Sequence, residues 1–147
     1  MPIRMAFPDE FPVLLPLLRG YTEFYESNPS DAGLEAMVAS AIAAPDDQAF
    51  LLVATDDDEV VGFANCQWKW SSLKGERVVV LDDLYVREEA RGEGHADALI
   101  AASGDVARQH GATVLTWFTQ QTNHRAQKVY NRVGGVSEPL LEYELEL

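Results

Sequence analysis

Residues 78–86, VVVLDDLYV, and residues 91–96, RGEGHA, decide the fold of this chain. The first stretch predicts a strand, and the second predicts a glycine-containing turn that leads into a helix. Such a turn leaves backbone N–H groups unpaired at the positive end of the helix dipole, where they can bind a phosphate or pyrophosphate. Gly92 and Gly94 suit the turn, because a residue without Cβ adopts positive φ and lets a ligand approach the main chain.

Two familiar kinds of phosphate-binding turn do not fit this pattern. A Walker loop requires Lys followed by Ser or Thr after its last glycine, whereas His95 and Ala96 follow Gly94 here. A dinucleotide-binding turn requires a third glycine and an acid at the end of the next strand. The next predicted strand, residues 114–118, ends without an acid.

A third kind of turn does fit. The segment 91–96 resembles the acetyl-coenzyme-A loop of the GNAT N-acetyltransferases, whose pattern is Gln or Arg, two residues, Gly, one residue, and Gly or Ala. Residues 123–130, NHRAQKVY, resemble the family's following helix, which carries an Asn near the cofactor and a Tyr near its sulfur. One predicted helix and one predicted strand separate the two motifs, as in the family. On residues 78–135 the chain is therefore identified as a member of the GNAT family.

The resemblance implies a mixed α/β fold in one domain, residues 1–147, with a central, mostly antiparallel twisted sheet flanked by about four helices. Hydrophobic periodicity and the positions of Pro and Gly predict the elements in the same order. Gly20 and the segment 21–26 are expected to end or bend the first helix, and Asp31 to cap the second. The predicted strands are 3–6, 49–54, 60–70, 78–86, 114–118 and 140–147, and the predicted helices are 9–26, 31–43, 94–110 and one that starts at Asn123.

The composition limits the classes of function. The net charge is −13, with only three lysines, so nucleic acid and membranes are not expected as partners, whereas a small cationic molecule would be attracted. The same charge can also serve solubility alone. No apolar run approaches the roughly 20 residues of a membrane span, and no signal peptide is recognisable, so a cytoplasmic protein is expected.

No disulfide or metal site is expected. The chain has one cysteine, Cys66, which lies in an alternating strand pattern and is predicted to be a buried core thiol. The three histidines show no spacing typical of metal ligands.

The resemblance implies that acetyl-CoA is the co-substrate. The strand end at residues 84–86, the loop at residues 91–96 and the helix that starts at Asn123 would bind it. Main-chain groups of one strand would pair with the pantetheine arm, and the loop would hold the pyrophosphate. In the family a bulge separates this strand from the next and opens a slot for the cofactor. The loop departs from the family at Glu93, which adds a negative charge, and at His95, which replaces an apolar residue. Which basic side chain meets the 3′-phosphate stays open among Arg91, Arg125, Lys128 and Arg132. The predicted cofactor-binding residues are Leu84, Tyr85, Val86, Arg91, Gly92, Glu93, Gly94, His95, Ala96, Asn123 and Lys128.

Acetyl transfer also needs a base for the amine and a proton for the departing thiolate. Asp82 and Asp83 stand where the family carries an acid near the amine, and paired acids resemble those of the diamine and polyamine acetyltransferases. Since adjacent strand residues face opposite ways, only one is expected to reach the cleft, and Asp82 is favoured. Tyr130 resembles the family's general acid, because a phenol stays protonated at neutral pH.

Four further residues are predicted to contact the acceptor: Tyr21, Tyr25, Glu26 and Trp68. Helix and sheet packing is the alternative role of each. The predicted function is transfer of the acetyl group to a primary amine of a small cationic acceptor, such as a polyamine or aminoglycoside, in a ternary complex. The alternatives are a protein or peptide acceptor and a non-catalytic CoA-binding module. Because many relatives dimerise, a homodimer is expected.

Overall fold

The computed structural model describes residues 2–147, which form two compact units that divide between Trp117 and Phe118. The first unit contains a sheet and three α-helices. The second contains one helix and the C-terminal residues. In the first unit the elements are β1 (Ile3–Met5), α1 (Phe11–Phe24), α2 (Asp31–Ala43), β2 (Ala49–Asp56), β3 (Glu59–Ser71), β4 (Glu76–Val86), the 3₁₀ turn η1 (Glu88–Ala90), α3 (His95–Gln109) and β5 (Leu115–Thr116), and in the second the helix is α4 (His124–Arg132).

The five strands form one sheet in the order β1-β2-β3-β4-β5. The first four pair antiparallel, and β5 pairs parallel with β4 through Val79–Leu115 and Val80–Thr116. The β2–β3 turn has positive φ at Asp57 (49°) and Asp58 (64°), as a two-residue hairpin of the favoured twist requires. This turn lies between the predicted strands 49–54 and 60–70, where the chain carries a run of acids, Asp56-Asp57-Asp58-Glu59.

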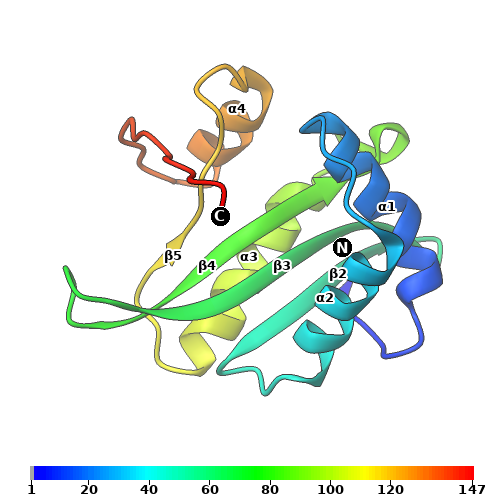
Figure 1. The fold of residues 1–147 in the computed structure, drawn as a ribbon, viewed down its shortest axis with the longest axis horizontal. Coiled ribbons are helices and arrows are strands. Elements are labelled where there is room, and N and C mark those ends of the chain that lie inside the picture. Colours follow the sequence, from blue (N-terminus) through cyan, green and yellow to red (C-terminus); the bar gives the residue numbers. More distant parts are fainter. Residues whose placement is uncertain (1) are drawn as a thin grey trace. The chain divides into compact units, whose positions relative to one another are not determined.

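Helices cover both faces of the sheet (Figure 1). On one face α1 and α2 pack their apolar residues over β2 and β3, with Leu14, Val38 and Phe63 in that core. On the other face α3 packs over β2, β3 and β4, with Leu99, Cys66 and Leu81 in its core. Alternation along each strand supplies the two faces, because successive side chains of a strand point to opposite sides.

Two local predictions about the helices were wrong. Ser30, not Asp31, caps α2: its Oγ accepts a hydrogen bond of 3.0 Å from the backbone N–H of Gly33. Gly20 does not end α1, which continues to Phe24 and so ends within the segment 21–26. A Cβ on Gly20 would lie 2.2 Å from the hydroxyl oxygen of Tyr85, so this glycine makes room for a side chain of the sheet.

The predicted strand at residues 140–147 was also wrong, since residues 136–147 contain no strand. Leu and Tyr alternate with Glu there, but alternation forms a strand only where a neighbouring strand accepts its backbone hydrogen bonds. The apolar side chains Leu141, Tyr143 and Leu145 are exposed. The predicted strand 114–118 shortens to the two residues of β5.

The remaining elements agree with the prediction to within a few residues. Among residues 2–147, no helix has the length and apolar character needed to cross a membrane.

Candidate active site

A β-bulge in β4 places both strand acids on one face of the sheet. Asn65 of β3 pairs with Asp83, but the next β3 residue, Cys66, pairs with Leu81, so Asp82 is an extra residue in β4. Leu81 and Leu84 both pack on the α3 side, and the two residues between them are therefore free to face the α1 side. The expectation that only one acid faces the cleft was wrong, because it assumed an unbroken alternation.

Each acid is held by an amide of the neighbouring strand. The Nδ2 group of Asn65 donates a hydrogen bond of 2.8 Å to an Oδ atom of Asp83, and Nε2 of Gln67 donates to an Oδ atom of Asp82. Asn65 and Gln67 are two residues apart on β3 and so share a face. These contacts show directly that both carboxylates lie on that face.

The surroundings raise the pKa of Asp82. The side chain is exposed, but the adjoining chain removes enough water from the carboxylate to raise its pKa. The hydrogen bond from Gln67 opposes this shift, and the negative charge of Asp83 adds to it. A carboxylate with a raised pKa is a stronger base near neutral pH than an ordinary aspartate.

Two tyrosines at the C-terminal end of α1 lie beside the acids. The hydroxyl of Tyr21 lies 3.5 Å from the carbonyl oxygen of Asp82. The rings of Tyr21 and Tyr25 lie 5.0 Å apart, and the pKa of Tyr25 is raised by burial and by the charge of Asp83. Glu26 follows the helix in an exposed position with φ of 55°. The structure therefore brings Tyr21 and Tyr25 together with the two acids.

Trp68 lies apart from this group. It packs against the core on the α3 side, its Nε1 donates a hydrogen bond of 2.9 Å to the carbonyl oxygen of Asp46, and the guanidinium of Arg77 stacks 4.7 Å from its ring. Cys66 is buried on the same side, as predicted. Burial raises the pKa of this thiol to about 12, which leaves it protonated and unsuited to act as a nucleophile.

The loop before α3 has the backbone that the sequence predicted. Gly92 and Gly94 have φ of 81° and 86°, and Gly94 is the N-cap of α3, so the free N–H groups of the first helical turn follow it. The side chain of Arg91 contacts the end of β4. Its Nε donates a hydrogen bond of 2.7 Å to the carbonyl oxygen of Val86, and its guanidinium stacks 5.4 Å from the Tyr85 ring.

The two departures from the family loop contact each other. An Oε atom of Glu93 lies 3.3 Å from Nε2 of His95, which is buried at the start of α3. The charge of Glu93 is thus directed at the imidazole. Ala96, in the first turn of α3, is half-buried.

The end of β4 has one open edge in the sheet. Residues 83–86 pair with β3, whereas β5 pairs with β4 only at Val79 and Val80. Beyond that point the second edge of β4, which includes Leu84, Tyr85 and Val86, has no partner in the sheet formed by the described residues. An open strand edge can hydrogen-bond an extended ligand as an added strand would.

The second unit carries the remaining predicted residues. Asn123 is the N-cap of α4, and its Oδ1 accepts a hydrogen bond of 3.2 Å from the backbone N–H of Ala126. Lys128 is exposed on α4, and Tyr130 is half-buried on it. The predicted start of this helix at Asn123 is confirmed to within one residue.

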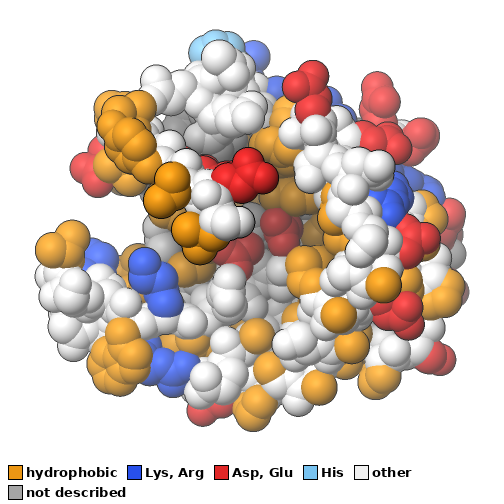
Figure 2. Space-filling model, viewed as in Figure 1, with side chains coloured by type: hydrophobic (Ala, Val, Ile, Leu, Met, Phe, Trp, Pro, Cys, Tyr) orange, Lys and Arg blue, Asp and Glu red, His pale blue; other side chains and the backbone are white. Residues whose placement is uncertain are grey.

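Charge is uneven over the first unit. The β3–β4 hairpin carries Lys69, Lys74 and Arg77, which include two of the three lysines of the chain. Figure 2 shows basic side chains at this hairpin, on the left of the view, and acidic side chains on the opposite side, beyond α1. The same view shows basic side chains among these acids, so the two sides differ in the proportion of charges and not in a complete separation.

Sequence reasoning did not assign a role to Asn65 or Gln67. The available signal was the presence of two amides at alternate positions of the strand that precedes the acids. Their pairing partners could not be chosen without the position of the bulge, which shifts the register by one residue.

The chain belongs to the GNAT family of acetyltransferases, whose family model matches residues 14–135. It is therefore an acyltransferase. It is 31% identical to an uncharacterized N-acetyltransferase, YhfO, of Bacillus subtilis (strain 168). The alignment spans 134 residues, which are 91% of this chain and 89% of that relative. It is 34% identical over 87 residues to a D-amino-acid N-acetyltransferase of Saccharomyces cerevisiae (strain ATCC 204508 / S288c), covering 59% of this chain and 54% of the relative. Among solved structures, a probable acetyltransferase has a TM-score of 0.84 at 29% identity and covers 100% of this chain and 98% of its own.

Proposed function

We propose that this protein transfers the acetyl group of acetyl-CoA to a primary amine of a small cationic acceptor by direct attack in a ternary complex. The observation that carries the proposal is the bulge, which presents Asp82 and Asp83 on one face beside Tyr21 and Tyr25. Two carboxylates on one face attract a molecule with more than one positive charge. The named acceptor of the yeast relative, a D-amino acid, is also a small molecule with an amine.

The loop and the open edge of β4 are proposed to hold the cofactor. The N–H groups that follow Gly92 and Gly94 suit the pyrophosphate, and the free edge at residues 84–86 suits the amides of the pantetheine arm. Asn123 and Lys128 are proposed to contribute from the second unit. Arg91 supplies a positive charge next to the loop.

Asp82 is proposed to accept the proton of the amine, directly or through water. An ordinary amine has a pKa close to that of Lys, about 10.4, so nearly all of it is protonated at pH 7, and base assistance is worth about 10²–10⁴-fold. Asp83 then anchors a second positive charge of the acceptor. Tyr130 is proposed to donate a proton to the departing thiolate of CoA.

The first test measures CoA release from acetyl-CoA with polyamines, aminoglycosides, free amino acids and basic peptides. We expect release with a small di- or polycationic amine, and a loss of about 10²-fold or more in kcat/KM for Asp82→Asn. Glu35→Gln, which removes one exposed negative charge from α2, is the matched control and should act like the parent protein. Release only with basic peptides would replace the small acceptor by a protein acceptor.

Tyr130→Phe separates an enzyme from a cofactor-binding module. We expect turnover to fall while the affinity for CoA, measured by calorimetry, stays unchanged, because the substitution removes only the hydroxyl. Unchanged turnover would remove Tyr130 from the mechanism. Tight CoA binding without release from any acceptor of the panel would favour a binding role.

A further inference from the structure

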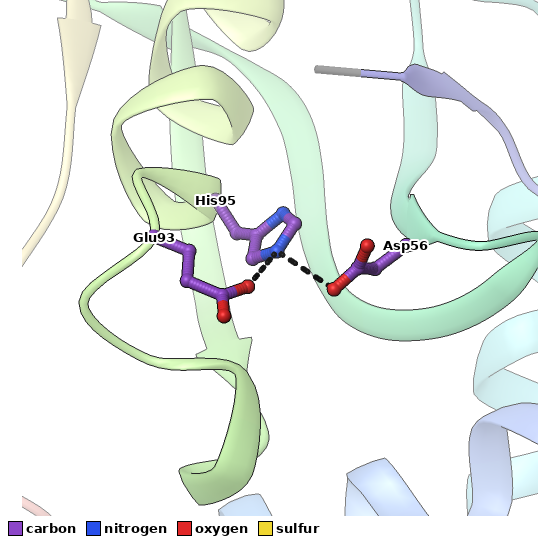
Figure 3. Close-up of side chains that lie close together, drawn as sticks. All are labelled: Asp56, Glu93 and His95. Carbon is purple, nitrogen blue, oxygen red and sulfur yellow. Dashed lines mark hydrogen bonds and ion pairs between the residues drawn. The ribbon is translucent and has the colours of Figure 1, made fainter.

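Three metal-ligating side chains from two segments of the chain meet beside the loop. Asp56 ends β2, Glu93 lies in the loop, and His95 begins α3. Figure 3 shows the three side chains pointing toward one another. The Nε2 atom of His95 lies 3.3 Å from an Oε atom of Glu93 and 4.0 Å from an Oδ atom of Asp56, and the three nearest ligand atoms lie within 4.8 Å of one another.

His95 has no partner outside this trio among residues 2–147. Its side chain is only 3% exposed, and its Nδ1 atom is buried without a hydrogen bond. A buried imidazole normally hydrogen-bonds through both nitrogens, so a ring that directs one nitrogen at two acids and leaves the other unpaired is unusual. The ring is held by the first turn of α3, and Nε2 is thereby fixed toward the acids.

The acids leave the trio open to solvent on one side. The side chains of Asp56 and Glu93 are 48% and 53% exposed, so an ion can reach Nε2 between them without opening the core. Asp56 is the last residue of β2 and Glu93 lies in the loop, and small rotations of their side chains change the separation of the ligand atoms.

We propose that Asp56, Glu93 and His95 bind a divalent transition-metal ion, with Zn²⁺ the best match. One imidazole nitrogen and two carboxylate oxygens form a ligand set that suits Zn²⁺, whereas Mg²⁺ and Ca²⁺ prefer oxygen ligands alone. In a tetrahedral site with bonds of about 2.0–2.2 Å, neighbouring ligand atoms stand roughly 3.3–3.5 Å apart. The separation of His95 and Glu93 already has this value, and that of His95 and Asp56 exceeds it by less than 1 Å. The ligand atoms of Asp56 and Glu93 lie within 4.8 Å of each other, so rotation of these two exposed side chains has to bring them closer. Water fills the fourth position.

Such an ion has a clear electrostatic effect on the loop. Without it, the carboxylates of Glu93 and Asp56 place two negative charges beside His95 at the start of α3, and a divalent cation bound to a neutral imidazole balances them. The ion also links the β2–β3 turn to the start of α3. The inference does not rest on the proposed function, because metal binding is measured without acetyl-CoA.

Calorimetric titration of the chelator-treated protein with Zn²⁺ tests the site. We expect one Zn²⁺ per chain, with Glu93→Gln and Asp56→Asn each weakening the affinity by about 10–100-fold or more, as losing even an outer-shell partner does. Both variants are at exposed side chains, and thermal unfolding verifies that they fold. Asp57→Asn, at the neighbouring turn position where positive φ also suits Asn, is the matched control and should bind as the parent does.

Nitrogen-15 NMR of the histidine rings provides a second measurement. We expect Zn²⁺ to shift the Nε2 resonance of His95 and to leave the exposed His110 unchanged. A titration without saturable binding would overturn the site, and the trio would then be an ion pair of His95 with two acids. Equal Zn²⁺ affinity in Glu93→Gln, Asp56→Asn and the parent protein would overturn it too.

Discussion

The two faces of the sheet differ most where β3 and β4 meet at the bulge. On the α3 side, Leu81, Cys66 and Leu84 form part of a dry core in which the pKa of the thiol rises to about 12. On the α1 side, the same strands present Asp82 and Asp83, each bound to an amide of β3 and open to a ligand. The difference arises from a single extra residue in β4.

The comparison teaches how a sheet can carry two adjacent charges on one face without exposing its core. In a regular strand, two successive acids point to opposite sides, and one of them would enter the core under α3. Burying an unpaired carboxylate there would cost several kcal/mol or force it to bind a proton. The bulge avoids this, because it turns both acids outward and returns Leu84 to the core.

Deleting Asp82 breaks the comparison and has the largest expected effect. The deletion joins Leu81 directly to Asp83, which restores the regular pairing with Cys66 and Asn65 and leaves one acid on the α1 face. We expect kcat/KM for a cationic acceptor to fall by about 10²–10⁴-fold, because the proposed base is lost. We expect the midpoint of thermal unfolding to change by no more than about 4 °C, roughly 1 kcal/mol, since both leucines keep their places in the core.

Deletion of Lys74, at the tip of the β3–β4 hairpin, is the control for shortening the same strand pair. It should retain activity. If the Asp82 deletion retained the activity of the parent protein, neither the bulge nor its acid would belong to the site. If it unfolded the protein, the bulge would be required by the fold itself.

A pair of helical glycines sharpens the comparison between the helices that cover the two faces. A Cβ on Gly20 of α1 would lie 2.2 Å from Oη and 2.7 Å from Cζ of Tyr85, whose ring is packed between Phe63 and Tyr21. The steric clash in Gly20→Ala should therefore destabilise the protein by about 1–3 kcal/mol. The higher helix propensity of Ala offsets part of this loss. It should also reduce activity, because the added Cβ displaces the ring of Tyr85, which lies close to the two acids.

Gly104 of α3 is the matched position on the other face. A Cβ at Gly104 would have as its nearest neighbours the atoms of the flexible Arg108 side chain, at 3.6–3.8 Å, so Ala fits there in ordinary contact. Gly104→Ala should stabilise the protein by about 0.5–1 kcal/mol and leave activity unchanged. Thermal unfolding of the two variants measures the contrast. The same sign of change in both would show that helix propensity, and not the contact with Tyr85, decides the outcome.

The sequence predicted the strand-loop-helix at residues 78–110 because apolar runs, two glycines and helical spacing lie next to one another in the chain. The resemblance implied a bulge in this strand but not its position, because the position is defined by the register between two strands, and nothing local to Asp82 marks it. For the same reason the amides Asn65 and Gln67 had no assigned partners.

The other errors also concern partners that are distant in sequence. Gly20 was taken as a helix breaker, but its role depends on Tyr85, 65 positions later. The alternation at residues 140–147 described a strand without indicating a neighbour to pair with. The trio of Asp56, Glu93 and His95 was invisible because its members come from two segments about 40 residues apart, so no spacing rule for metal ligands applies.

The smallest expected effect concerns the two groups that act on Asp82 in opposite directions, and it tests whether that residue is the base. Activity that needs the Asp82 carboxylate falls as the pH drops through its pKa. Gln67 donates a hydrogen bond that stabilises the charged form and lowers this pKa, whereas the charge of Asp83 raises it. In the profile of kcat/KM against pH, the acid limb should therefore move to higher pH in Gln67→Leu and to lower pH in Asp83→Asn. A change in the maximal kcat/KM of either variant does not affect this expectation.

Rates measured against pH at several acceptor concentrations separate this shift from weaker binding, which changes KM at every pH. Gln109→Leu, the same change on the helix that covers the other face, should leave the limb where it is in the parent protein. Opposite displacements in the two variants would identify Asp82 as the titrating group, because no other carboxylate contacts Gln67 through a hydrogen bond in the described structure. Displacement of both limbs in the same direction would instead assign the limb to another group, and the acid pair would then serve only to attract the acceptor.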